Sequence, residues 1–171
     1  MTQEEKRGLT RRELLTKAAS VSALALIGIG FICAPTGAWA MEVKVIKPEE
    51  MATLLQMARD IYPHDQVADQ FYAVAVKGYD AEDKKALVEA GIAELDAAAK
   101  AMGHASYAAI GWEEDRVKVL QSVEKTTFFQ TVRAGLVTGL YNQKEVWPIF
   151  GYEGESYSQG GYIARGFDDI N

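Results

Sequence analysis

The chain has few of the side chains that hold metals or form disulfides: one cysteine, Cys33, and two histidines in 171 residues. The histidines, His64 and His104, lie forty positions apart with no cysteine near either, which is not a zinc-ligand pattern. No glycine-rich nucleotide fingerprint follows a strand-like run. We therefore predict that this chain holds no metal and no nucleotide or flavin cofactor of its own.

Basic residues are scarce beyond position 40. The chain has 18 Lys and Arg against 24 Asp and Glu, and five of the basic but only three of the acidic residues lie in residues 1–40. The remainder is strongly acidic, and an acidic surface repels the phosphates of nucleic acids. A nucleic-acid partner is therefore excluded. The length and the 49% hydrophobic content suit one folded domain with a core of its own.

Residues 1–40 have the pattern of an export signal. Arg11 and Arg12 precede a stretch without charged side chains, residues 18–34, which serine and glycine make only mildly hydrophobic. The arginine pair resembles a twin-arginine (Tat) signal. Ala38 and Ala40 then form the A-x-A pattern that signal peptidase cleaves. We predict a periplasmic protein that the Tat translocase exports.

Cleavage after Ala40 would leave a mature chain without cysteine, which excludes disulfides, thiolate metal sites and a catalytic thiol. The alternative is an uncleaved membrane anchor, because the uncharged stretch is only slightly shorter than the roughly 20 residues that span a bilayer.

Residues 41–141 are predicted to form an all-α body, a small bundle of about five helices, because apolar residues recur at spacings of three and four. Pro48 begins the first helix and Pro63 ends it. Asp65 is the predicted N-cap of the second helix. The third spans residues 81–102, the fourth begins in the acidic turn that follows Trp112, and the fifth spans 128–141. No run alternates long enough to require a sheet.

Residues 142–171 form a glycine- and aromatic-rich tail. Flexible linkers are polar and poor in aromatics, so this segment is expected to pack on a surface. That surface is either the helical body of the same chain or a partner. Both kinds of packing can occur in one protein if the tail uses different faces for them. The predicted partner-docking side chains are of the types enriched at interface hot spots: Trp147, Tyr152, Tyr162, Arg165 and Phe167.

Two blocks of sequence carry a family resemblance. The first runs Ala58-Arg59-Asp60-Ile61-Tyr62-Pro63-His64-Asp65, with Asp69 and Tyr72 following. The second comprises Leu140-Tyr141-Asn142, Val146-Trp147, Gly151-Tyr152-Glu153-Gly154, Gly160-Gly161-Tyr162 and Arg165-Gly166-Phe167-Asp168-Asp169-Ile170. Together they resemble the family of gluconate 2-dehydrogenase subunit 3 and the sorbitol dehydrogenase small subunit.

The resemblance implies a non-catalytic small subunit of a periplasmic dehydrogenase complex. In such complexes a large subunit carries FAD and oxidises a sugar, polyol or aldonic acid, and a cytochrome c subunit with haem c takes the electrons. The large subunit lacks an export signal and crosses the membrane bound to the small subunit. The resemblance also implies that the complex can associate with the membrane.

A stand-alone periplasmic enzyme or ligand-binding protein is the alternative. It would use His64, Asp65 and Asp69 in a pocket between helices, although a histidine and an aspartate at a helix junction more often serve local capping. Arg59 and Asp60 could equally form a salt bridge inside the body, and Arg165 is a candidate for an ion pair between subunits.

Overall fold

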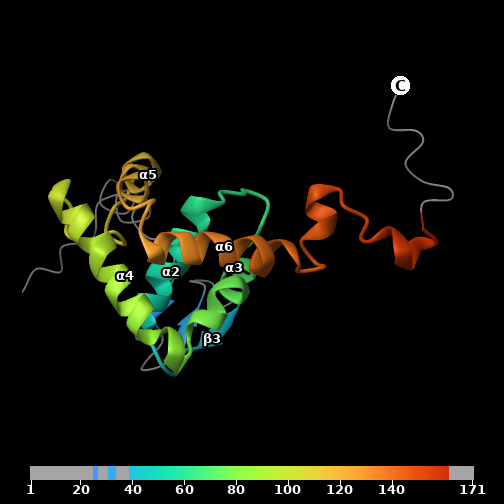
Figure 1. Ribbon diagram of the computed structural model, residues 1–171, viewed down its shortest axis with the longest axis horizontal. Coiled ribbons are helices and arrows are strands. Elements are labelled where there is room, and N and C mark those ends of the chain that lie inside the picture. Colours follow the sequence, from blue (N-terminus) through green and yellow to red (C-terminus); the bar gives the residue numbers. More distant parts are fainter. Residues whose placement is uncertain (1–24, 27–30, 34–38, 162–171) are drawn as a thin grey trace, which may run out of the picture.

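A computed structural model describes residues 25–26, 31–33 and 39–161 of the chain (Figure 1). Within these residues the chain forms five α-helices, which confirms the predicted all-α class. They are α2 (Pro48–Ile61), α3 (Asp69–Val76), α4 (Glu82–Ala101), α5 (Glu113–Ser122) and α6 (Thr127–Tyr141). Three 3-10 turns, η1 (Lys77–Tyr79), η2 (Trp147–Phe150) and η3 (Ser156–Gln159), complete the helical elements.

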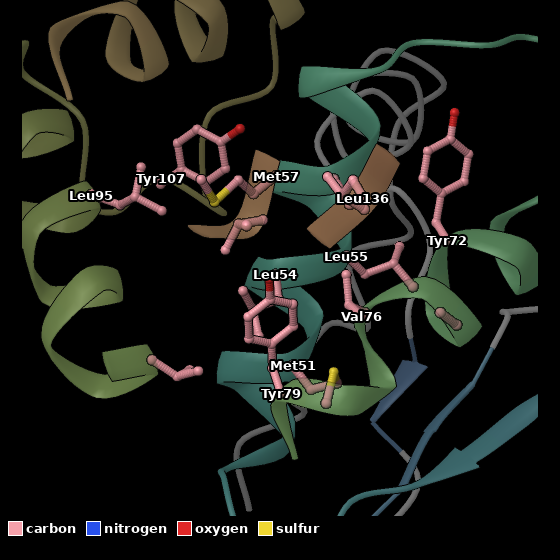
Figure 2. Packing of buried hydrophobic residues seen from close by; sticks show 14 of the residues in the cluster. Met51, Leu54, Leu55, Met57, Tyr72, Val76, Tyr79, Leu95, Tyr107 and Leu136 are labelled. Atoms are coloured by element: carbon pink, nitrogen blue, oxygen red, sulfur yellow. The ribbon is translucent and has the colours of Figure 1, made fainter. Parts of the chain in front are cut away.

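Helix α2 lies at the centre of the body and contacts α3, α4, α5 and α6. Pro48 occupies its first turn, where a missing N–H costs no hydrogen bond, and the backbone N–H of Lys47 donates to the Glu50 carboxylate at 2.8 Å. Its buried side chains face neighbours on several sides, and Figure 2 shows Met51, Leu54, Leu55 and Met57 among side chains of the surrounding helices. The core is therefore organised around one central helix.

Glycine allows two close helix contacts. A Cβ atom on Gly139 of α6 would lie 3.1 Å from the backbone oxygen of Ala75 on α3, so these helices approach almost backbone to backbone. A Cβ atom on Gly91 of α4 would fall 1.9 Å from the ring of Phe128, which packs directly onto the α4 backbone. Both contacts bring α6 close to its neighbours.

Three short strands accompany the helices: β1 (Ala25–Leu26), β2 (Phe31–Cys33) and β3 (Ala40–Glu42), antiparallel and in that order. Ile32 of β2 pairs with Met41 of β3 and is fully buried in the core. No run of the sequence alternates long enough to require a sheet, and residues 25–26 and 31–33 belong to the predicted export signal. The alternation that marks β3 is too short to detect, since it extends over only three residues.

The Asp80 carboxylate fixes the segment that follows β3. It accepts hydrogen bonds from the backbone N–H groups of Lys44 at 2.9 Å, Val45 at 2.8 Å and Ile46 at 3.2 Å. Partial burial acts to raise the pKa of Asp80, but the three backbone donors outweigh it and lower the pKa below its usual value. Lys77 adds a second tie, because its ammonium donates to the Glu42 carbonyl at 3.2 Å.

A buried ion pair joins α2 to α5. The Asp60 carboxylate, 8% exposed, accepts from Arg116 Nε at 2.7 Å and Nη2 at 3.0 Å. The hydroxyl of Tyr107 donates to the same carboxylate at 2.5 Å, and the Gln56 amide donates at 3.1 Å. Burial, followed by the neighbouring carboxylate, raises the pKa of Tyr107 well above its usual value.

Two local predictions were wrong. Asp65 does not cap the second helix, which begins at Asp69 after Ala68, because residues 64–67 form a turn in which the Val67 N–H bonds the His64 carbonyl. Arg59 and Asp60 do not pair with each other. Adjacent residues on a helix point in different directions, so Arg59 pairs with Asp69 while Asp60 pairs with Arg116.

The helix boundaries predicted elsewhere agree closely with the structure. Gly103 follows α4 with a φ of +88°, the conformation expected after a helix C-terminus. In the part of the chain that the structure describes, no helix is long and apolar enough to cross a membrane.

We expect Arg116→Ala to lower the free energy of unfolding by about 3–5 kcal/mol, because it leaves the Asp60 carboxylate buried without its cation. The matched control is Lys118→Ala on the same helix, whose ion pair with Asp115 is exposed and should contribute little. Urea unfolding of both variants measures the difference. Equal losses would contradict a special role for the buried pair.

We expect Asp80→Ala to lower the free energy of unfolding by about 1–2 kcal/mol at pH 7. The folded pKa of Asp80 is lowered, so its stabilisation is complete above the unfolded pKa of about 4 and is lost as pH falls through the folded value. The deficit of the variant should therefore shrink below pH about 4. Urea titrations from pH 7 to pH 2.5 test this. Glu94→Ala, an exposed carboxylate on α4, should show no such pH dependence.

Candidate functional site

The described part of the tail, residues 142–161, leads away from the C-terminal end of α6. Figure 1 shows η2 next to that end and η3 well clear of the helical body. Neither 3-10 turn contains a buried residue. The tail is thus attached at its start and projects outward beyond it.

Trp147 is the centre of the first part of the tail. Its indole N–H donates to the Tyr141 carbonyl at 2.7 Å, which satisfies one of the free carbonyls at the end of α6. The ring meets that of Tyr152 edge to face with centroids 5.2 Å apart. Gly154, with a φ of +101°, brings the chain back so closely that a Cβ there would lie 3.2 Å from the indole. The structure therefore brings the predicted docking residues Trp147 and Tyr152 together.

An aromatic junction, defined here as Tyr62, His64, Tyr141 and Phe150, joins the tail to the body. His64 Nε2 and the Tyr141 hydroxyl are 2.7 Å apart. The Phe150 ring lies edge to face on the His64 ring at 4.9 Å between centroids, and Tyr62 packs on Tyr141 at 5.8 Å. Burial first, and then the nearby tyrosines, raises the pKa of Tyr141, so its hydroxyl stays protonated at neutral pH.

The proposed acid–base residues of the alternative function have separate partners. His64 contacts Tyr141 through its ring, and its backbone N–H donates to the Tyr72 hydroxyl at 3.2 Å. Asp69 accepts from Arg59 at 2.7 Å. Asp65 is exposed in the turn between α2 and α3. His64 and Asp69 therefore tie the segment between α2 and α3 to its neighbours, through Tyr141 and Arg59 respectively.

Metal ligands do not gather in the part of the chain that the structure describes. No group of three or more His, Cys, Asp or Glu side chains there is arranged to hold a metal ion. His104 is half-buried in the segment between α4 and α5, on a different part of the fold from His64.

Large apolar side chains are exposed along the tail. Phe150 is 46% exposed, Tyr152 is 52% exposed and Tyr157 of η3 is 93% exposed. Beside Trp147 and Tyr152 the tail surface also has a hollow of about 410 Å³ that Lys144 borders. Single exposed aromatics are common, but several on one short projecting segment are typical of a protein-binding surface. Among the residues that the structure describes, the other large exposed apolar side chains are Val74, Met102, Trp112 and Val137.

Several predicted residues lie outside the described residues: Arg11, Arg12, Ala38, Tyr162, Arg165 and Phe167. Ala40 is described, is exposed and belongs to β3. The aromatic junction was not predicted from the sequence. A signal for it was present, since His64 and Tyr141 belong to the two motif blocks, but nothing in the sequence indicated that the blocks meet.

No protein-family model, curated protein or solved structure matches this chain. The resemblance described above therefore depends on the motif residues themselves.

Proposed function

We propose that this chain is the non-catalytic small subunit of a periplasmic, FAD-dependent dehydrogenase complex. In this role it binds the large flavoprotein subunit in the cytoplasm, carries it through the Tat translocase and stabilises it afterwards. The FAD belongs to the large subunit and haem c to a cytochrome c subunit, and the substrate class is a sugar, polyol or aldonic acid.

The observation that carries the proposal is the exposure of the projecting aromatic tail. A tyrosine 93% exposed at η3, preceded by Tyr152 and Phe150, presents apolar area that a partner would remove from water. Tyrosine and tryptophan dominate the energetics of protein interfaces because they bury large areas at little entropic cost. A tail that projects from its own body is arranged for binding another subunit.

The aromatic junction also supports the proposed role as a non-catalytic subunit. His64 belongs to the first motif block and Tyr141 to the second, and the two are 2.7 Å apart in the fold. Phe150 packs on both rings. These motif residues therefore have a structural role. They hold the start of the tail on the body and so set the direction in which the tail leaves.

Export of the flavoprotein tests the escort role. In cells that make both proteins, the double variant Arg11→Lys, Arg12→Lys should abolish dehydrogenase activity in the periplasm, because the pair is the proposed address of the whole complex. Activity is measured in periplasmic and cytoplasmic fractions. Arg7→Lys makes the same chemical change outside the pair and should leave export normal. Normal periplasmic activity in the double variant would contradict the escort role.

Docking through the tail is tested with two aromatic variants. Tyr157→Ala should weaken the complex with the flavoprotein by about 1–4 kcal/mol and leave the melting temperature of the isolated chain unchanged, because Tyr157 is exposed. Trp147→Ala should lower both the affinity for the flavoprotein and the melting temperature of the isolated chain, since the Trp147 indole bonds the end of α6.

Titration of the purified flavoprotein with each variant, together with thermal melts of the chain alone, gives the two quantities. Unchanged affinity in Tyr157→Ala and in a chain truncated after Asn142 would contradict docking through the tail.

A further inference from the structure

Strand β2 lies within the uncharged stretch assigned to the export signal, yet it is part of the folded body. It pairs with β3 in a register that places Phe31 opposite Glu42, Ile32 opposite Met41 and Cys33 opposite Ala40. Ile32 has no exposed surface, and β2 also contacts helix α2. A segment with an export role is therefore bound to the surface of the same chain.

Contacts other than those with β2 also hold the surface that receives it. The Lys77 ammonium bonds the Glu42 carbonyl of β3, and the Asp80 carboxylate bonds three consecutive backbone N–H groups directly after the strand. Met41 of β3 and Val43, which follows the strand, are buried in the same apolar cluster as Ile32. The strand β3 is thus a fixed edge, and β2 adds to it as a paired strand does in β-augmentation.

The predicted cleavage point lies inside this pairing. Ala40 is the first residue of β3 and the partner of Cys33. Proteases act on segments that leave their own hydrogen-bonded structure, so a bond within a paired strand is protected until the pairing opens. Cleavage after Ala40 would separate β1, β2 and Ala40 itself from the body.

We propose that β3 and helix α2 form a binding site for the chain's own export segment, occupied by residues 31–33 with Ile32 as the anchor. The proposal rests on the proposed function, in which residues 1–40 are an export signal. In the full chain this site retains the apolar segment of the signal, and the segment is released before signal peptidase acts. Opening of the β2–β3 pairing then controls the rate of processing.

The single cysteine provides a direct test of the pairing. In full-length Ala40→Cys, the new thiol lies opposite Cys33, at a separation of about 4.5–5.5 Å between Cα atoms that allows a disulfide. Mild oxidation at low concentration should form the intramolecular disulfide, seen as the loss of both free thiols and of two mass units. Lys44→Cys is the matched control, exposed but four residues further on, about 13 Å along the chain. Two free thiols in Ala40→Cys, or equal oxidation of both variants, would overturn the proposal.

The processing rate tests the functional consequence. Full-length protein is incubated with purified signal peptidase in detergent, beside a synthetic peptide of residues 30–45 as the unpaired substrate. The peptide should be cleaved faster than the chain. Ile32→Ser should accelerate cleavage of the chain about tenfold or more, because cleavage follows the population of the open form, while Ile32→Val should change it little.

The possible results distinguish the proposed binding site for β2 from the proposed export signal. Equal rates for the chain, Ile32→Ser and the peptide would overturn the binding site while leaving the export signal intact. A peptide that is not cleaved would overturn the assigned cleavage point and this proposal with it. The escort role is judged separately, by flavoprotein activity in the periplasm.

Discussion

Helix α2 lies at the centre of the body and contacts the other four helices. The arrangement of the body depends on how the buried Asp60 carboxylate near the C-terminal end of α2 is neutralised. Asp60 lies at a position that the packing buries, and a buried carboxylate without a partner would be strongly destabilising. Arg116 from α5, Tyr107 from the preceding loop and Gln56 from α2 itself meet this requirement together. The network therefore fixes where α5 and its connecting segment lie against the central helix.

The same end of α2 leads into the aromatic junction. After Ile61 the chain turns at Pro63, and His64 meets Tyr141 at the last turn of α6. Tail residue Phe150 packs against both rings, and the Trp147 indole bonds the Tyr141 carbonyl. Edge-to-face aromatic pairs of this kind contribute about 0.5–1.5 kcal/mol each beyond their buried area. Several contacts therefore hold the root of the tail on the body, although the side chains further along it are exposed.

The proposed escort role gives the N-terminal segment and the C-terminal tail different functions. In that proposal the N-terminal segment would direct the chain to the translocase, and the tail would bind the flavoprotein. Strand β2 lies within the proposed export segment and is also part of the folded body, because Ile32 pairs with Met41 of β3 and is buried in the core cluster. β3 in turn is tied by Asp80 and Lys77 to the segment just after α3. The pairing of β2 with β3 therefore depends on contacts made by the helical body.

The sequence by itself determined the all-α class and most helix boundaries, because these follow from local features: apolar spacing, Pro48 in a first turn and Gly103 after a last one. It also predicted, from residue type, that Trp147 and Tyr152 are docking side chains, and this remains a prediction. Tertiary structure alone decided that Asp60 pairs with Arg116 rather than Arg59, that His64 meets Tyr141, and that Ile32 enters the core. Each of these contacts joins segments whose approach depends on the packing of the whole body, and no local pattern records it.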